Sequence, residues 1–247
     1  MARPTVAASP RPAAGAAWQL RLLGQPALIE KAAGREFALR PKDAALLAVV
    51  ALAGPIKADH VAAMLWPEAS AKQADASLRQ RLFRLRRDTA TALVSSGALL
   101  ALEPDLHSDL QSTLDKIHVD GHAGQAELLG DLQFDELPDL AAWLRAERQK
   151  WHDQRDVVLS AAAAACEKAG AVAQGLVYAQ RLADNEPLAE YAHRRLMRLH
   201  YLRGDRAAAI NVFERFEQRL KDELGTRPSA ETIELLATIE RGAATLP

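Results

Sequence analysis

Residues 73–87 place amide and guanidinium side chains on one side of a helix that the sequence predicts over residues 75–90. At about 100° per residue, Leu78, Leu82 and Leu85 form one apolar stripe that must be buried. Arg can bond guanine O6 and N7 together, and Gln can bond adenine N6 and N7. The spacing therefore predicts base contacts in a DNA major groove from the polar residues opposite the stripe, which are Gln73, Ser77, Gln80, Arg84 and Arg87.

More basic side chains flank this polar side of the helix. They are suited to phosphate oxygens, which set the register of a protein on a duplex, and we expect phosphate contacts from Lys72, Arg79, Arg81 and Arg86. The alternative is a solvated basic helix face without a partner. Few acids stand at i±4 to neutralise Arg84, Arg86 and Arg87, which argues against that alternative.

Charge is divided unevenly along the 247 residues, although the formal net charge is only −1. Residues 1–93 contain fourteen Lys and Arg against seven Asp and Glu, a balance of +7. Residues 94–247 contain 17 basic and 25 acidic residues, a balance of −8. The first part could therefore face a polyanion and the second should not.

Several short elements must position the basic helix. Alternating side chains predict three short strands between Trp18 and Leu39, separated by turns at 24–26 and 31–34. A helix should begin at Pro41 and end at Gly54, and a second should be capped by Asp59 and stop before Pro67. A polar turn over 68–74 then precedes the basic helix, and a hairpin over 92–102 follows it. Strands, three helices and a hairpin are the order of a winged helix-turn-helix.

From Asp109 onward the pattern is helical almost throughout, with breaks at 121–124, 130–138, Gly170, 185–187, Gly204 and 225–228. Sliding the chain by 34 residues places Gly170 on Gly204 and Leu182 on Phe216. A helix pair of 34 residues is the period of tetratricopeptide repeats. The fold class predicted is therefore mainly α, a winged helix-turn-helix with a small β-sheet and hairpin followed by an all-α tetratricopeptide-like domain.

Motifs for catalysis or ligand binding are weak. The run 170–175 has phosphate-loop glycine spacing but lacks the Lys-Ser/Thr that should follow it. His118 and His122 could hold a metal, as in a metal-dependent enzyme, but Gly121 interrupts the helix that would align them. Cys166 is predicted to be a small core residue, and Trp143 and Trp151 to be packing anchors. We expect no enzyme activity, no cofactor and no metal.

The ends of the chain carry little further signal. Residues 1–17 are rich in Ala and Pro and lack the apolar run of a secretory signal, so we expect a disordered arm. No stretch of 18 uncharged apolar residues occurs, and Cys166 has no partner cysteine. These features exclude a membrane span and a disulfide scaffold and predict a cytoplasmic protein.

Two segments resemble a known class of proteins. The run Leu65-Trp66-Pro67, a polar turn and then 77–87, with Leu102-Glu103-Pro104-Asp105 after the hairpin, resembles the OmpR-type winged helix of SARP-type bacterial transcriptional activators. Residues 139–151, 188–203 and 213–236 resemble the bacterial transcriptional activator domain, and 224–232 is its most specific part. Two departures stand out, because Phe83 replaces a small polar residue and the wing carries no Lys or Arg. Phe83 could pack on a neighbour or contact a thymine methyl.

The resemblance implies a domain order and a function. It implies an arm over 1–17, a DNA-binding winged helix over 18–107 and an activator domain over 108–243. By the same resemblance the chain would bind direct repeats in double-stranded DNA as a homo-oligomer and recruit RNA polymerase, with no membrane contact. The alternative is a protein-interaction adaptor that uses the tetratricopeptide-like domain with little or no DNA binding.

Overall fold

A computed structural model describes residues 17–95, 99–120 and 125–242, without the side chains of 118–120. The chain forms two compact units, and neither is continuous in sequence. Unit 1 consists of residues 1–113 and 124–150, and unit 2 of residues 114–123 and 151–247. The predicted domain boundary at 107/108 stays a prediction, since the compact units divide the chain differently.

Unit 1 contains a four-stranded sheet in the order β3-β2-β1-β6. Its strands are β1 (Trp18–Arg21), β2 (Ala27–Glu30), β3 (Glu36–Ala38) and β6 (His107–Ser108). The first three pair antiparallel, as the two predicted turns require, and β6 pairs parallel with β1. Side chains alternate across β1, so Trp18 and Leu20 are buried while Gln19 and Arg21 are partly exposed. The three short strands predicted from alternation are present.

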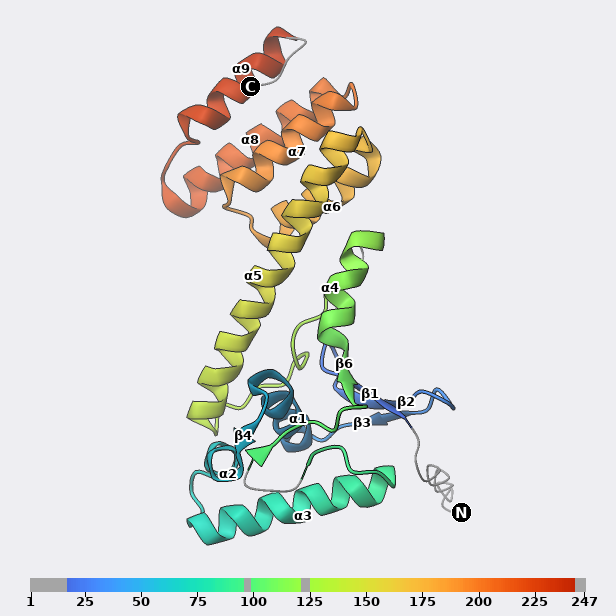
Figure 1. The fold of residues 1–247 in the computed structure, drawn as a ribbon. Coiled ribbons are helices and arrows are strands. Elements are labelled where there is room, and N and C mark those ends of the chain that lie inside the picture. The colour runs from blue at the N-terminus through green and yellow to red at the C-terminus, as the bar shows by residue number, and fades with distance from the viewer. Residues whose placement is uncertain (1–16, 96–98, 121–124, 243–247) are drawn as a thin grey trace, which may run out of the picture. The chain divides into compact units, whose positions relative to one another are not determined.

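Three helices follow the first three strands (Figure 1). They are α1 (Pro41–Ala53), α2 (Ala58–Leu65) and α3 (Ala71–Thr89). Pro41 opens α1 and Gly54, with φ of +67°, follows its last residue, as predicted. Two details of the prediction are wrong. Lys57, not Asp59, occupies the N-cap of α2, and α3 begins at Ala71, so half of the predicted polar turn is helical.

The predicted hairpin after α3 is present at its described ends. Val94 and Leu102 form an antiparallel bridge, and the Ser95 amide donates to the Ala101 carbonyl at 2.9 Å. Strand β5 (Leu99–Leu100) pairs with β4 (Ile56–Lys57), which precedes α2. The tip of the hairpin, residues 96–98, lies outside the described residues.

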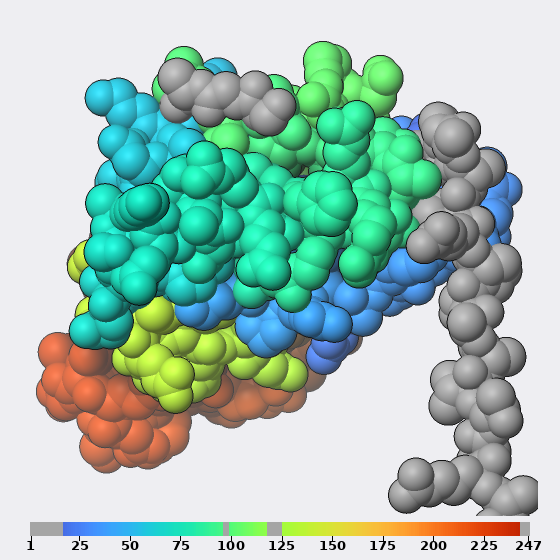
Figure 2. Space-filling view, turned by 90° about the horizontal axis from the view of Figure 1, so that it is seen from below, coloured from blue at the N-terminus to red at the C-terminus, as the bar shows by residue number. Residues whose placement is uncertain are grey.

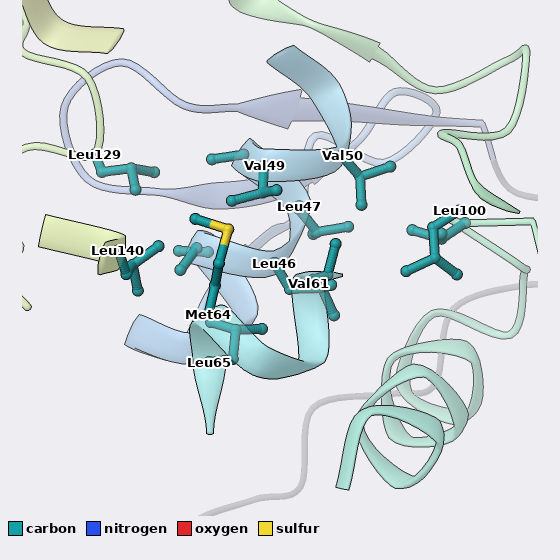
Figure 3. Close-up of a cluster of buried hydrophobic side chains, with 14 of the residues drawn as sticks. Leu46, Leu47, Val49, Val50, Val61, Met64, Leu65, Leu100, Leu129 and Leu140 are labelled. Carbon is teal, nitrogen blue, oxygen red and sulfur yellow. The ribbon is translucent and has the colours of Figure 1, made fainter. Parts of the chain in front are cut away.

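The core of unit 1 draws on residues far apart in sequence (Figure 3). Leu46 and Val50 of α1 and Leu65 of α2 pack in one cluster with Leu129 and Leu140. The sequence pattern places 125–129 in a helix, and that is wrong, because Leu128 instead forms a bridge with Leu23. The chain passes so close there that a Cβ on Gly130, whose φ is +52°, would lie 2.6 Å from the Gly24 carbonyl oxygen. The segment after residue 124 thus completes the core of the winged helix.

Unit 2 is built from helices. α4 (Asp109–Asp120) and α5 (Pro138–Ala169) contribute residues to both units. They are followed by α6 (Val172–Asn185), α7 (Glu190–Leu202), α8 (Arg206–Leu224) and α9 (Ala230–Arg241). The 34-residue offset relates α6 to α8, since Gly170 and Gly204 both have positive φ just before these helices, and Leu182 and Phe216 are both buried. The predicted fold class is confirmed.

Candidate nucleic-acid interface

Helix α3 packs on unit 1 through one apolar side, and local hydrogen bonds terminate both of its ends. Leu78 and Leu85 are buried, with Leu82 packed against the same core. Ser70 and Gln73 form a capping box at the N-terminus, where the Ser70 amide donates to Gln73 Oε1 at 3.1 Å. At the other end the Thr89 hydroxyl donates to the Leu85 carbonyl at 2.8 Å. The helix therefore lies with its apolar side on the core and its polar side outward.

The outward side of α3 forms a continuous strip on the surface of unit 1 (Figure 2). We call this strip the α3 face. Exposed side chains on it include those of Lys72, Gln73, Arg79, Gln80, Phe83, Arg86 and Arg87, and those of Ser77 and Arg84 are partly exposed. All five predicted base-contact residues and three of the four predicted phosphate-contact residues are thus on one accessible surface.

The cations of the α3 face are weakly neutralised within unit 1. Arg79 pairs with Asp75 at 2.9 Å and Arg87 with Asp88 at 2.8 Å, and all four side chains are largely exposed. Such surface pairs contribute about 0–1 kcal/mol, so an anionic ligand can replace them at little cost. Among the described residues, Lys72, Arg84 and Arg86 form no ion pair. The electrostatics of the face therefore favour an anion.

Gln73 also caps α3, a role that was not predicted from the sequence. Its Oε1 also accepts a hydrogen bond from the Ser70 hydroxyl at 2.8 Å, so the amide oxygen is committed to the helix cap. Only the amide NH2 group is left for a base edge, and the two-bond pairing with adenine needs both ends of the amide. Gln80, whose side chain is exposed in mid-helix, fits that pairing better.

Arg81 is the predicted site residue that the structure places elsewhere. Its Nη1 lies 2.6 Å from Asp43 Oδ1 of α1, and both side chains are only 14% exposed. Its guanidinium carbon also lies 5.7 Å from the centre of the Trp66 ring, which Lys42 Nζ approaches at 5.3 Å. Burial, followed by the charge of Arg81, lowers the pKa of Lys42, which donates to the Leu65 carbonyl at 2.8 Å. We therefore assign Arg81 to the joint between α1, α2 and α3 rather than to a phosphate.

The described residues of the wing include no Lys or Arg. The pairing of β4 with β5 nevertheless places the exposed Lys57 directly opposite Leu99. Lys57 was missed because it lies some 40 residues from the wing in sequence, and only the pairing of β4 with the wing strand reveals it. It supplies a cation next to the wing.

A shallow hollow of about 250 Å³ lies between α3 and the root of the wing. Its apolar floor includes Leu82, Leu93 and Val94, and its rim includes Arg79, Phe83 and Arg86. Phe83 is 65% exposed although it borders this hollow, so packing on the described residues does not account for it.

In unit 2, the segment 224–232 is bonded to α7 by Glu190 and also by Arg194, which pairs with Glu231 at 3.0 Å. Gly225, with φ of +65°, ends α8 and Ser229 is the N-cap of α9, as its sequence suggests. The Ser229 side chain does not cap the helix, however. Glu190 of α7 accepts hydrogen bonds from the Ser229 amide at 3.0 Å, the Ser229 hydroxyl at 2.5 Å and the hydroxyl of the buried Thr232. Glu190 thus fastens α9 to α7.

This carboxylate predicts a pH-dependent contribution to stability. Burial raises the pKa of Glu190, but hydrogen bonds from Ser229 and Thr232 outweigh burial and hold it below the usual 4.5. A lowered pKa in the folded state stabilises the fold above pH 4.5, and this stabilisation is lost as the pH falls through the folded value. We expect Glu190→Gln to reduce the free energy of unfolding by about 1–3 kcal/mol at pH 7. In urea titrations followed by circular dichroism, the gap to the unsubstituted chain should shrink below pH 4.5, and a constant gap would contradict this role.

The other motifs have structural roles or lie outside the described side chains. Gly170 ends α5, and a Cβ on Gly175 would lie 3.1 Å from Leu199 Cδ2, so these glycines serve helix termination and packing. The predicted pair His118 and His122 falls outside the described side chains, and the described residues contain no cluster of three metal-ligating side chains. No described helix has the length and apolarity needed to span a membrane.

Comparisons with known proteins bear on the fold and on the C-terminal part of the chain. Residues 125–240 match the family model of the bacterial transcriptional activator domain. The solved structure of Mycobacterium tuberculosis EmbR in complex with a low-affinity phosphopeptide is similar in fold, with a TM-score of 0.68 and 20% sequence identity. The similarity covers 92% of this chain and 65% of the EmbR chain, so this chain spans less than two thirds of the length of that protein. No curated protein matches the sequence significantly.

The matched model describes a domain of bacterial transcriptional activators, and the EmbR structure shares the arrangement of a winged helix followed by helices. The match over residues 125–240 covers slightly less than half of the chain, and the winged helix followed by helical repeats that the resemblance implies is confirmed as the fold.

Proposed function

We propose that this chain is a sequence-specific, double-stranded-DNA-binding regulator of transcription that acts as an activator. The observation that carries the proposal is the α3 face, on which amide and guanidinium groups lie together, exposed and weakly neutralised. A helix of this kind fits the major groove, where two-bond contacts from Arg and Gln distinguish bases.

Roles on the α3 face follow from exposure and existing partners. Gln80, Arg84 and Arg87 are the main candidates for base contacts, and Ser77 and the Gln73 amide group can add single hydrogen bonds. Phosphate contacts are assigned to the exposed cations Lys72, Arg79 and Arg86, with Lys57 beside the wing as an addition. Arg81 is left out, because Asp43 already holds its guanidinium.

Unit 2 supplies protein contacts in this proposal. Family resemblance supports binding of direct repeats by two or more protomers and recruitment of RNA polymerase. The acidic balance of residues 94–247 supports a protein partner rather than a nucleic acid for this part of the chain.

The direct test is selection of bound duplexes from a random pool, followed by gel shifts at moderate salt with the best site and a scrambled duplex. The proposal is supported if the protein shifts the selected duplex at protein concentrations that leave the scrambled duplex unbound. If neither duplex is retained, the adaptor becomes the better interpretation.

Salt dependence offers a second prediction. The logarithm of the association constant should fall linearly with the logarithm of salt concentration, by about 0.9 for each phosphate neutralised. Arg86→Ala should weaken binding about equally for all sequences and reduce that slope by about one per bound protomer. Fluorescence anisotropy with labelled duplexes between low and moderate salt measures both. An affinity that does not change with salt would contradict DNA binding through this face.

A further inference from the structure

Phe83 is an apolar side chain in the middle of a polar surface. It is 65% exposed, and its neighbours at i±3 and i±4 along the helix are Arg79, Gln80, Arg86 and Arg87. Three cations and one amide thus surround the ring. Most of the phenyl group is not covered by the described residues, so it is available for a contact outside the chain.

The duplex that the α3 face is proposed to bind presents one apolar group on its base edges in the major groove, the C5 methyl of thymine. The other groups there are hydrogen-bond donors and acceptors, which a phenyl ring cannot satisfy. We propose that Phe83 contacts a thymine methyl and selects a thymine at one position of the bound site. This inference rests on the proposed function and adds an apolar base contact to the polar ones.

The positions of the neighbouring side chains support this contact. At about 100° per residue, Phe83 lies about 60° from Gln80 and 40° from Arg87 around the helix axis, so all three point to the same side. Arg79 and Arg86 lie beyond Phe83 on the flank assigned to phosphates. The ring therefore stands between the base-reading centre and the backbone-binding edge, which places the thymine next to the base pairs that Gln80 and Arg87 contact.

A second copy of this chain is a less suitable partner for Phe83. Two copies meeting through this face would bring the same cluster of guanidiniums together, and the like charges would repel each other. Duplex DNA instead supplies negative charge that can neutralise the guanidiniums around Phe83.

The experiment uses the full chain and a duplex chosen by selection. Each thymine of the site is replaced in turn by deoxyuridine, which removes only the C5 methyl and keeps the hydrogen-bonding groups. At one position in each bound repeat the unsubstituted chain should lose about fourfold in affinity, which corresponds to one buried methyl group. Phe83→Ala should bind the thymine and deoxyuridine duplexes equally well, and Phe83→Leu should retain part of the preference.

Val157→Ala provides the matched control, because Val157 is 69% exposed but belongs to unit 2. This variant should keep the full preference for thymine. The proposal is overturned if no thymine shows a methyl effect that depends on Phe83, or if Phe83→Ala weakens both duplexes equally. It is also overturned if Phe83→Ala changes only the number of protomers per duplex, which would indicate a contact between copies. A chain that binds no duplex overturns the proposed function together with this inference.

Discussion

Arg81→Ala should destabilise unit 1 by about 2–4 kcal/mol, because it leaves the carboxylate of Asp43 without its partner. The two side chains are each only 14% exposed, so water cannot fully replace the lost interaction. The substitution also removes one of the two cations that lie against the Trp66 ring. Urea unfolding followed by circular dichroism measures the change.

Arg86→Ala is the matched control for this prediction. Arg86 is exposed on the same helix and forms no ion pair among the described residues, so its loss should change stability by less than about 0.5 kcal/mol. The double variant Arg81→Ala with Asp43→Ala should lose less than the sum of the single variants, because the two residues act as a pair. If Arg81→Ala leaves stability unchanged and lowers DNA affinity uniformly, Arg81 contacts a phosphate after all.

Arg84→Ala should reduce affinity for the selected duplex by about 1–3 kcal/mol and relax the preference at one base position. The reason is that Arg84 is partly exposed beside Gln80 on the α3 face and has no ion pair in the described part of unit 1. Its guanidinium is thus available for a two-bond contact with guanine. Affinities for the selected site and its single-base variants, measured by gel shift, give both the size and the position of the effect.

Comparing the DNA affinities of Arg84→Ala and Arg86→Ala distinguishes a contact with a base from a contact with the phosphate backbone of the DNA. Loss of a phosphate contact lowers affinity for all sequences alike, whereas loss of a base contact changes their ranking. A uniform loss for Arg84→Ala would show that Arg84 belongs to the backbone contacts and that the assignment of the face is wrong.

Local patterns were enough to predict the first three strands and most of the helices of this protein, but they did not predict β4 or β6 and wrongly placed 125–129 in a helix. The leucine spacing at 78, 82 and 85 located α3 and its outward side, because one apolar stripe fixes the orientation of a helix. The start of α3 was missed by four residues, although Ser70 and Gln73 match the capping-box pattern that could have located it.

Features that depend on distant partners could not be predicted in this way. Asp43 lies 38 residues from Arg81, and Ser229 lies 39 residues from Glu190. In each case the sequence shows a charged residue but does not show whether folding will provide a partner for it. The exposure of Phe83 belongs here too, since a phenylalanine on the polar side of a predicted helix is equally compatible with packing under a neighbouring segment.

The chain segment after residue 124 determines how much of the protein can fold by itself. Arg148 of α5 donates to the backbone carbonyls of Leu128, Gly130 and Leu132, and Leu140 and Leu144 of the same helix fill the core of unit 1. About three turns of α5, which lies within the stretch that matches the activator-domain model, are therefore part of the winged-helix core. A fragment that ends at the wing would lack these core side chains, so an isolated winged helix should be stable only if it extends to about residue 150.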